Sequence, residues 1–125
     1  MYMTSSWMTK HSHGDIAETH LHENSLVSGV VYLKVPPNSG DLFFKMSVDS
    51  ERRIFPTTIS PNIETNNRYN SKHVQFLVKE GLILLFPSTI LHSVSKNLSN
   101  DDRYVIAFNY FIKGKLGYVT NELII

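Results

Sequence analysis

Cysteine is absent from the 125-residue sequence. Its absence excludes disulfide bonds, thiolate metal ligands and a cysteine nucleophile, and it fits a reducing compartment. No apolar run is long enough to cross a membrane as a helix, and residues 1–10 lack the apolar core of a signal peptide. We therefore expect a cytoplasmic protein that does not act at a membrane.

Charge of either sign is also sparse. Basic and acidic residues nearly balance, so that the net charge is +1, and no basic run is longer than Arg52-Arg53. We therefore expect no nucleic-acid partner. The hydrophobic share of 42% is too high for a disordered chain. The length suffices for one core, which predicts a single domain over residues 1–125.

Short strands with frequent turns dominate the pattern, and no long amphipathic helix is predicted. β-branched, aromatic and other apolar residues predict strands over residues 26–35, 41–46, 74–78, 82–86, 103–111 and 118–125. The Asn38-Ser39-Gly40 turn predicts that the first two strands form a hairpin. The unbroken apolar run over residues 82–86 predicts a strand buried on both faces. The fold class is therefore all-β, a sandwich or a barrel.

Two segments have a pattern that points to a binding site. Residues 47–71 are polar, and we interpret them as a long loop that covers or binds a substrate. Residues 103–111 alternate in size, so that small or polar side chains share one face and bulky ones the other. The first face is predicted to line a cavity and holds Arg103, Val105, Ala107 and Asn109, whereas the second holds Tyr104, Ile106, Phe108 and Tyr110.

Histidines are the most informative residues that are present. His20 and His22 are spaced by two, which places both side chains on the same face of a strand. His92 follows the predicted strand over residues 82–86, just beyond Pro87. Three imidazoles brought together in this way would suit iron, copper, nickel or zinc. The spacing alone also fits incidental surface or core histidines.

The other three histidines are predicted to play no part in a site. His11 and His13 have the same spacing as His20 and His22, but they lie in a polar stretch beside Gly14, and we expect both to be exposed to solvent. His73 ends the polar loop and is also interpreted as a surface residue.

The order of these segments resembles that of the 2-oxoglutarate- and Fe(II)-dependent dioxygenases, most closely a small branch among phage and bacterial proteins. The resemblance covers about residues 7–112. The stretches that carry it are His20-Leu21-His22, Ser28-Gly29-Val30-Val31-Tyr32-Leu33, Ser39-Gly40-Asp41-Leu42-Phe43-Phe44, Gly81 to Ser88 with His92-Ser93-Val94, and Arg103-Tyr104-Val105-Ile106-Ala107-Phe108-Asn109.

This resemblance implies a double-stranded β-helix, or jelly roll, with few or no helices. It implies that His20 and His92 bind Fe(II), with His22 as the third ligand. Arg103 and Tyr32 would hold the distal carboxylate of 2-oxoglutarate, as a guanidinium fork does well. Asn109 would line the same pocket. The implied reaction uses dioxygen to hydroxylate a C–H bond and converts the oxo acid to succinate and carbon dioxide.

The sequence departs from the family pattern in two respects. The usual ligands are two histidines and one carboxylate, and here His22 takes the carboxylate position. Glu23 is a possible replacement, with Asp15 and Glu18 as more distant ones. The chain also has few residues before His20 for the helices that buttress many relatives. The barrel is therefore minimal or completed by another subunit, and the bulky face of residues 103–111 would form a homo-oligomer interface.

Two other classes of function remain open. A cupin-type metal protein would also use a His-x-His pair and a distal histidine, without an oxo acid. It would normally carry a glutamate a few residues after the pair, which this chain lacks, and it would leave Arg103 without a role. A non-enzymatic phage β-sandwich module would make the histidines incidental. None of these patterns identifies a substrate.

Overall fold

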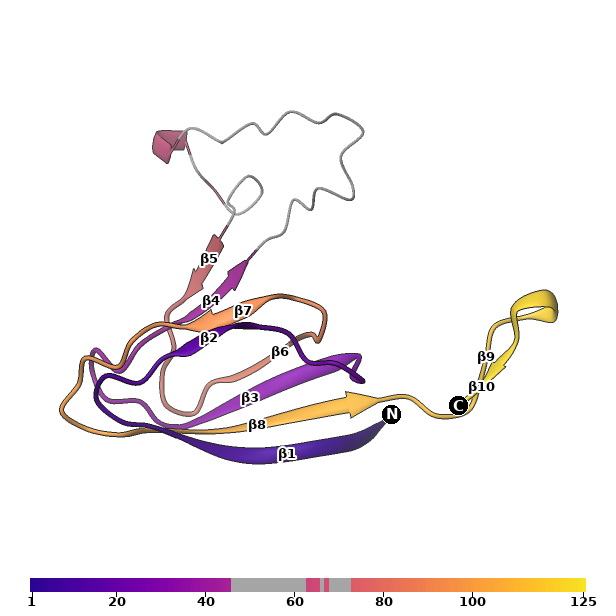
Figure 1. Cartoon of the computed structure of the whole chain (residues 1–125), viewed down its shortest axis with the longest axis horizontal. Coiled ribbons are helices and arrows are strands. Elements are labelled where there is room, and N and C mark those ends of the chain that lie inside the picture. Colours follow the sequence, from indigo (N-terminus) through magenta and orange to yellow (C-terminus); the bar gives the residue numbers. More distant parts are fainter. Residues whose placement is uncertain (46–62, 66, 68–72) are drawn as a thin grey trace.

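Two antiparallel four-stranded sheets face each other in the computed structural model, which describes residues 1–45, 63–65, 67 and 73–125 (Figure 1). The major sheet has the strand order β1-β8-β3-β6, and the minor sheet has the order β2-β7-β4-β5. The strands are β1 (Tyr2–His11), β2 (Ala17–His20), β3 (Val27–Lys34), β4 (Leu42–Lys45), β5 (His73–Phe76), β6 (Ile83–Pro87), β7 (His92–Val94), β8 (Arg103–Phe111), β9 (Lys115–Leu116) and β10 (Leu123–Ile124).

This arrangement confirms the predicted all-β jelly roll. The helical content of the described residues is limited to two single 3₁₀ turns, η2 (Ile63–Thr65) and η3 (Val119–Asn121). Among these residues, no helix has the length and apolar character needed to span a membrane. Apart from η2 and Asn67, the predicted loop over residues 47–71 lies outside the described residues.

The predicted hairpin between the segments now seen as β3 and β4 is wrong. β3 pairs with β6 and β8 in the major sheet, whereas β4 pairs with β5 and β7 in the minor sheet. Two consecutive prolines follow β3, and proline has no N–H with which to continue a ladder. Gly40 then adopts a φ of 89°, and the chain crosses from one sheet to the other.

The prediction that residues 82–86 are buried on both faces is also wrong. β6 lies at the edge of the major sheet, and its side chains alternate. Phe86 is buried in the core, whereas Ile83 and Leu85 are 59% and 65% exposed on the outer face. The unbroken apolar run therefore belongs to a strand that is buried on one face only, because apolar residues also occur on the outer face of this sheet.

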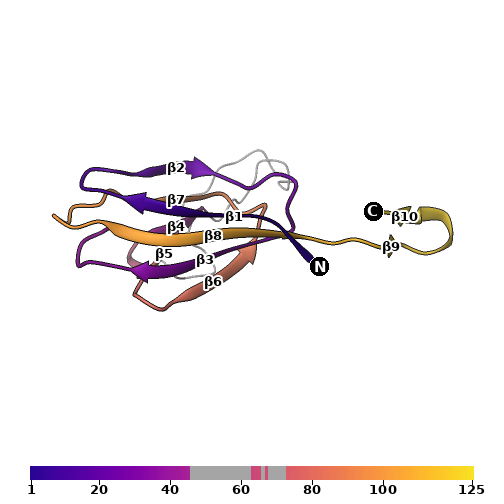
Figure 2. The ribbon, with the colours of Figure 1, turned by 90° about the horizontal axis from the view of Figure 1, so that it is seen from below.

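β1 was not predicted as a strand, although it is the longest one. It pairs with β8 from Tyr2 to His11, and Figure 2 shows β8 between β1 and β3. Its sequence is polar, and most of its side chains are exposed, so the usual apolar signal is weak. This strand completes the major sheet on one side of β8.

The alternation predicted for residues 103–111 is confirmed. Arg103, Val105 and Asn109 are buried on the inner face of β8, whereas the bulky side chains of the outer face are only half-buried. Packed between the two sheets is a small hydrophobic core of Leu42, Phe44 and Phe86. The cavity described below lies beside this core.

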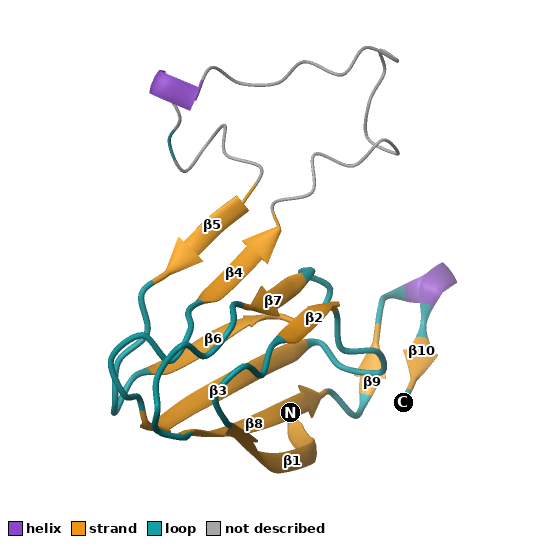
Figure 3. Cartoon of the chain, turned by 60° about the vertical axis from the view of Figure 1, so that its left-hand side comes forward, coloured by secondary structure: helices purple, strands orange, loops and turns teal. Residues whose placement is uncertain are grey.

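The chain continues past β8 into a small hairpin of β9 and β10, which projects away from the two sheets (Figures 1 and 3). The predicted strand over residues 118–125 is therefore found only at Leu123–Ile124, and η3 occupies part of the remainder.

Candidate metal centre

Three histidines converge between the strands of the minor sheet. His20 ends β2 and lies directly opposite His92, the first residue of β7. His22 follows two residues after β2 and turns toward the same point, so that its ring centroid lies 5.4 Å from that of His20 and 5.0 Å from that of His92. One potential ligand atom from each of the three side chains lies within 4.8 Å of the other two. The three residues predicted as ligands are thus brought together.

Each imidazole is held through its Nδ1 atom by an oxygen. Nδ1 of His20 lies 2.7 Å from the Glu18 carbonyl oxygen, and Nδ1 of His92 lies 2.9 Å from that of Ile90. Nδ1 of His22 lies 2.7 Å from Oδ1 of Asn109. Because these oxygens accept hydrogen bonds, each Nδ1 is assigned as the protonated donor. All three Nε2 atoms then carry a free lone pair, which is what a metal requires.

A group of buried polar side chains holds His22 in place through hydrogen bonds at its Nδ1 atom. The Ser28 hydroxyl lies 2.9 Å from Nδ1 of His22 and donates to Oδ1 of Asn109 at 2.8 Å. Ser88 lies 2.7 Å from Ser28 and donates to Ser25 at 2.8 Å. Such partners fix the ring orientation of a metal ligand and raise its basicity. Asn109, predicted to line the co-substrate pocket, contacts a predicted ligand instead.

Burial keeps His92 neutral. The pKa of His92 is lowered to about 4, mainly by desolvation. The Ile90 carbonyl opposes this shift, and His20 and His22 add to it. A neutral imidazole is the form that binds metal, so His92 needs no deprotonation near neutral pH.

No carboxylate belongs to this cluster within the described residues. Glu23, the possible replacement, is exposed in the turn after His22. Asp15 accepts a hydrogen bond from the backbone of Ser12, at 2.8 Å, and Glu18 contributes its carbonyl rather than its carboxylate. The donor set found here is therefore three neutral imidazoles.

A cavity of about 140 Å³ extends from the histidines between the two sheets. Its wall is mostly apolar, with a few polar side chains. Strands β1, β3 and β8 supply much of that wall, and the lining residues include Trp7, Thr9, His11, Val30, Tyr32, Phe86, Val94, Arg103, Val105 and Ala107. The small side chains predicted on the inner face of β8 leave this space open.

Arg103 is the principal charged group of the cavity and is 1% exposed. Nη1 donates to the Gly40 carbonyl at 2.8 Å, whereas Nε is buried without a hydrogen-bond partner. No carboxylate of the described residues lies within ion-pair distance. Burial lowers the pKa of Arg103, and Tyr32 and Asp41 oppose that shift. A guanidinium stays charged in proteins, so Arg103 is a buried cation. Its Nε has no hydrogen-bond partner and remains an unused donor.

Tyr32 lines the cavity from β3 and is also buried. Desolvation raises the pKa of its hydroxyl to about 12, although the Arg103 charge acts in the opposite direction. The hydroxyl therefore keeps its proton at neutral pH and can donate it to an anion. Tyr32 and Arg103, predicted to hold one carboxylate together, line the same cavity.

Three residues that line the cavity from β1 were missed from the sequence: Trp7, Thr9 and His11. His11 is buried and lines the cavity, so the prediction that it faces solvent is wrong. Trp7 lines it as well, and its ring centroid lies 5.6 Å from that of His22. Trp7, Thr9 and His11 are spaced by two, which would place them on one face of a strand. This spacing predicts a shared face only once residues 2–11 are recognised as a strand. His13 and His73 are exposed, as predicted.

Comparison with solved structures gives the same fold. An oxidoreductase of the 2OG-Fe(II) oxygenase family from Burkholderia pseudomallei has a TM-score of 0.61 and 11% identity, covering 86% of this chain and 43% of its own. A prolyl-4-hydroxylase from Pseudomonas putida has a TM-score of 0.53 and 14% identity over 83% and 50%. Apo HygX from Streptomyces hygroscopicus has a TM-score of 0.56 and 14% identity over 86% and 56%.

The chain thus spans about half the length of these solved structures. No curated protein matches it in sequence. A family model described as "Putative 2OG-Fe(II) oxygenase" matches residues 5–109, which include every histidine of the cluster and Arg103. With the jelly roll, the convergent histidines and the buried arginine already described, this match shows that the chain belongs to the 2OG-Fe(II) oxygenase family.

Proposed function

We propose that this protein is a non-haem Fe(II)- and 2-oxoglutarate-dependent dioxygenase that hydroxylates a C–H bond. The observation that carries the proposal is the orientation of three imidazoles. Each has its Nδ1 engaged by an oxygen, and each offers Nε2 to one shared point. His20, His22 and His92 would hold Fe(II). Iron and 2-oxoglutarate would together supply the activation of dioxygen, the oxidant. One of its oxygen atoms would enter the C–H bond, and the other would enter succinate as the oxo acid loses carbon dioxide.

The charge of the donor set supports an anionic co-substrate. Three neutral imidazoles leave the two positive charges of the metal uncompensated, so a 2-oxo acid that chelates it gains Coulomb energy at short range. The far carboxylate of 2-oxoglutarate would accept hydrogen bonds from the unused donors of Arg103 and from the hydroxyl of Tyr32. This accounts for a buried guanidinium that has no carboxylate partner within the described residues, an arrangement that is otherwise costly.

The apolar wall of the cavity serves the same chemistry. Phe86, Val94 and Val105 exclude water from the space between the histidines and the arginine. Low polarity strengthens the carboxylate–guanidinium attraction, and it limits side reactions with solvent.

Anaerobic titration tests the proposal directly. Fe(II) and 2-oxoglutarate added together should give a weak visible charge-transfer band, which requires the oxo acid to chelate iron. His20→Ala and His92→Ala should lose the band and stoichiometric metal binding, because each removes a ligand. Arg103→Ala should keep the metal but weaken 2-oxoglutarate by at least about 2 kcal/mol, the scale of breaking a buried charge pair. In air, wild type should form succinate.

His13→Ala is the matched control, since His13 is exposed and does not belong to the cluster. Metal binding without any effect of 2-oxoglutarate would favour the cupin-type alternative. A protein that binds neither would be a structural module, and the proposal would fail.

A further inference from the structure

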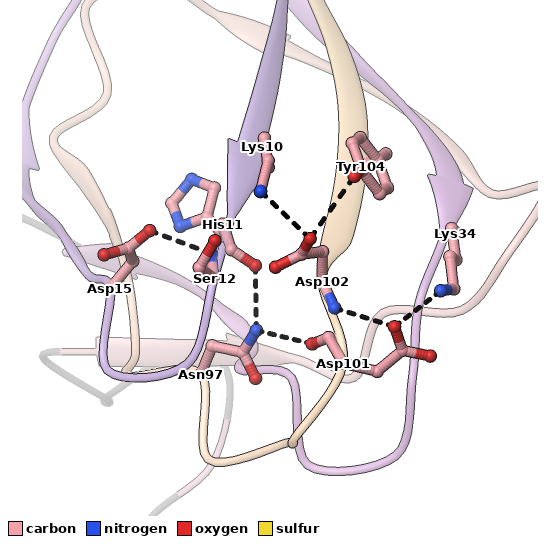
Figure 4. A network of polar contacts seen from close by, with 9 residues as sticks. All are labelled: Lys10, His11, Ser12, Asp15, Lys34, Asn97, Asp101, Asp102 and Tyr104. Carbon is pink, nitrogen blue, oxygen red and sulfur yellow. Dashed lines mark hydrogen bonds and ion pairs between the residues drawn. The ribbon is translucent and has the colours of Figure 1, made fainter.

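His11 is a buried imidazole that the proposed reaction does not yet use. It ends β1, is 8% exposed, and its side chain lines the cavity. Figure 4 shows that its surroundings are fixed by polar contacts on the backbone side. Asn97 donates to the His11 carbonyl at 2.8 Å and to the Asp101 carbonyl at 3.1 Å, while the neighbouring Lys10 pairs with Asp102 at 3.1 Å. The backbone that carries this ring is therefore held in place by the fold.

The ring itself has no hydrogen-bond partner among the described residues, although the His11 carbonyl accepts a hydrogen bond from Asn97. Buried polar side chains are usually hydrogen-bonded within the protein or to a bound molecule. Its direct partner across the β1–β8 ladder is Arg103, and side chains at such positions lie about 5 Å apart at Cβ. Nε of Arg103 is also buried without a partner. Two adjacent unpartnered donors on the wall of one cavity point to an anionic ligand.

The electrostatic surroundings favour a neutral imidazole there. Desolvation lowers the pKa of His11, the Arg103 charge lowers it further, and Asp15 opposes both. Near neutral pH the ring therefore contributes one N–H to a ligand and adds no second positive charge beside Arg103. A carboxylate has two oxygens, which can be shared between the guanidinium and this N–H.

We propose that His11 is a further anchor, beside Arg103 and Tyr32, for the distal carboxylate of the dicarboxylate co-substrate. The inference rests on the proposed function. His11, the last residue of β1, would thus help the protein to select an oxo acid that carries a second carboxylate at its far end. A ligand that contacts only the metal should not sense His11.

Calorimetric titration of the Co(II)-loaded protein with two ligands provides the test. 2-Oxoglutarate would reach both the metal and His11, whereas oxalate can chelate the metal but has no distal carboxylate. His11→Leu should weaken 2-oxoglutarate about tenfold, the scale of one hydrogen bond to a charged group. Oxalate affinity should not change. His11→Gln keeps an N–H donor and should recover part of the loss, and His13→Leu should behave as wild type toward both ligands.

Each other outcome counts against the assignment. Equal 2-oxoglutarate affinity in wild type and His11→Leu would overturn it. An equal loss for both ligands would also overturn it, since it would reveal a general distortion of the site; thermal melting of each variant would identify the same defect. Oxalate binding by a wild type that does not bind 2-oxoglutarate would instead refute the proposed function itself, and this inference with it.

Discussion

At the scale of single residues, the centre depends on groups that never touch the metal position. Asn109 has Oδ1 2.7 Å from Nδ1 of His22 and donates from Nδ2 to Ser5 at 3.2 Å. A side chain held at both ends cannot rotate freely, so the orientation of His22 follows from that of Asn109. In families with a carboxylate at the His22 position, no such acceptor would be needed.

Replacing Asn109 should therefore weaken metal binding without removing a ligand. Asn109→Leu is expected to lower Co(II) affinity about tenfold, the lower end of the range for second-layer partners of metal-bound histidines, because Ser28 remains as an acceptor. Asn109→Asp should keep or raise the affinity, since a carboxylate makes the imidazole more basic. Competition against a coloured chelator measures both, with the exposed Asn100→Leu as control. Wild-type affinity in Asn109→Leu would contradict the role given to Asn109.

A second prediction at this scale concerns acid. The pKa of His92 is about 4 in the folded chain against an ordinary value of 6.5, so between these values the unfolded chain binds more protons. Stability of the metal-free protein should be complete above pH 6.5 and fall as the pH drops toward 4. The contribution of His92 is about 3 kcal/mol over that window, at about 1.4 kcal/mol per pKa unit.

Urea unfolding in the presence of a chelator, at pH 7 and at pH 4.5, measures this difference. His92→Gln has no titrating group and should lose less stability on acidification than wild type, whereas the exposed His13→Gln should lose as much as wild type. The same acid loss in His92→Gln would show that His92 is not held neutral by burial.

At the scale of elements, the crossing between β3 and β4 connects the two sheets and also serves the site. Gly40 lies in this crossing, and its carbonyl accepts the hydrogen bond from Arg103. A Cβ at Gly40 would collide with the Ser95 carbonyl oxygen, and its φ of 89° is unfavourable for any side chain.

Gly40→Ala should therefore destabilise the protein by at least about 2 kcal/mol, because backbone strain and a backbone clash add. Gly14 has the same φ of 89° but no atom within 4 Å of an added Cβ, so Gly14→Ala isolates the strain and should cost about 1 kcal/mol. Denaturant midpoints of the two variants make the comparison. Equal losses would mean that the Ser95 contact is unimportant.

Sequence patterns predicted most strands here, and they failed where tertiary context decides. The alternation of β8 correctly placed Arg103 inside, because a period of two fixes faces without knowledge of the partner strands. The same rule could not identify β1 from its polar sequence. That segment is recognised as a strand only once β8 is known to have a free edge beside it. Pairing between β3 and β4 was wrongly predicted because a turn sequence specifies a reversal, not the sheet to which the chain returns. The histidines were identified from the spacing of His20 and His22 and from the place of His92 after an apolar run, although His22 lies outside β2.

At the scale of the whole molecule, the space between the sheets is shared by a small core and a cavity. The apolar residues that are buried among those described are Tyr32, Leu42, Phe44, Phe86 and Val105. Much of the remaining interior is polar and organised around the candidate site. A ligand that binds there, and only to the folded state, stabilises the chain by mass action.

Co(II) at about one hundred times its dissociation constant should raise the free energy of unfolding by about 2.7 kcal/mol, as expected for one site. Thermal unfolding with and without metal measures the gain, and His20→Ala should abolish it while the exposed His73→Ala keeps it. A gain that persists in His20→Ala would locate the metal elsewhere.

The position of Trp7 gives the molecule an optical property of its own. It is the single tryptophan of the chain, and its indole lies beside His22 on the wall of the cavity. Emission selectively excited from indole therefore originates at the candidate site, although six tyrosines are also present. An ion with a partly filled d shell bound to the histidines would quench the fluorescence of Trp7, whereas a closed-shell ion would change that fluorescence far less. The occupancy of the centre can thus be followed in the unlabelled protein.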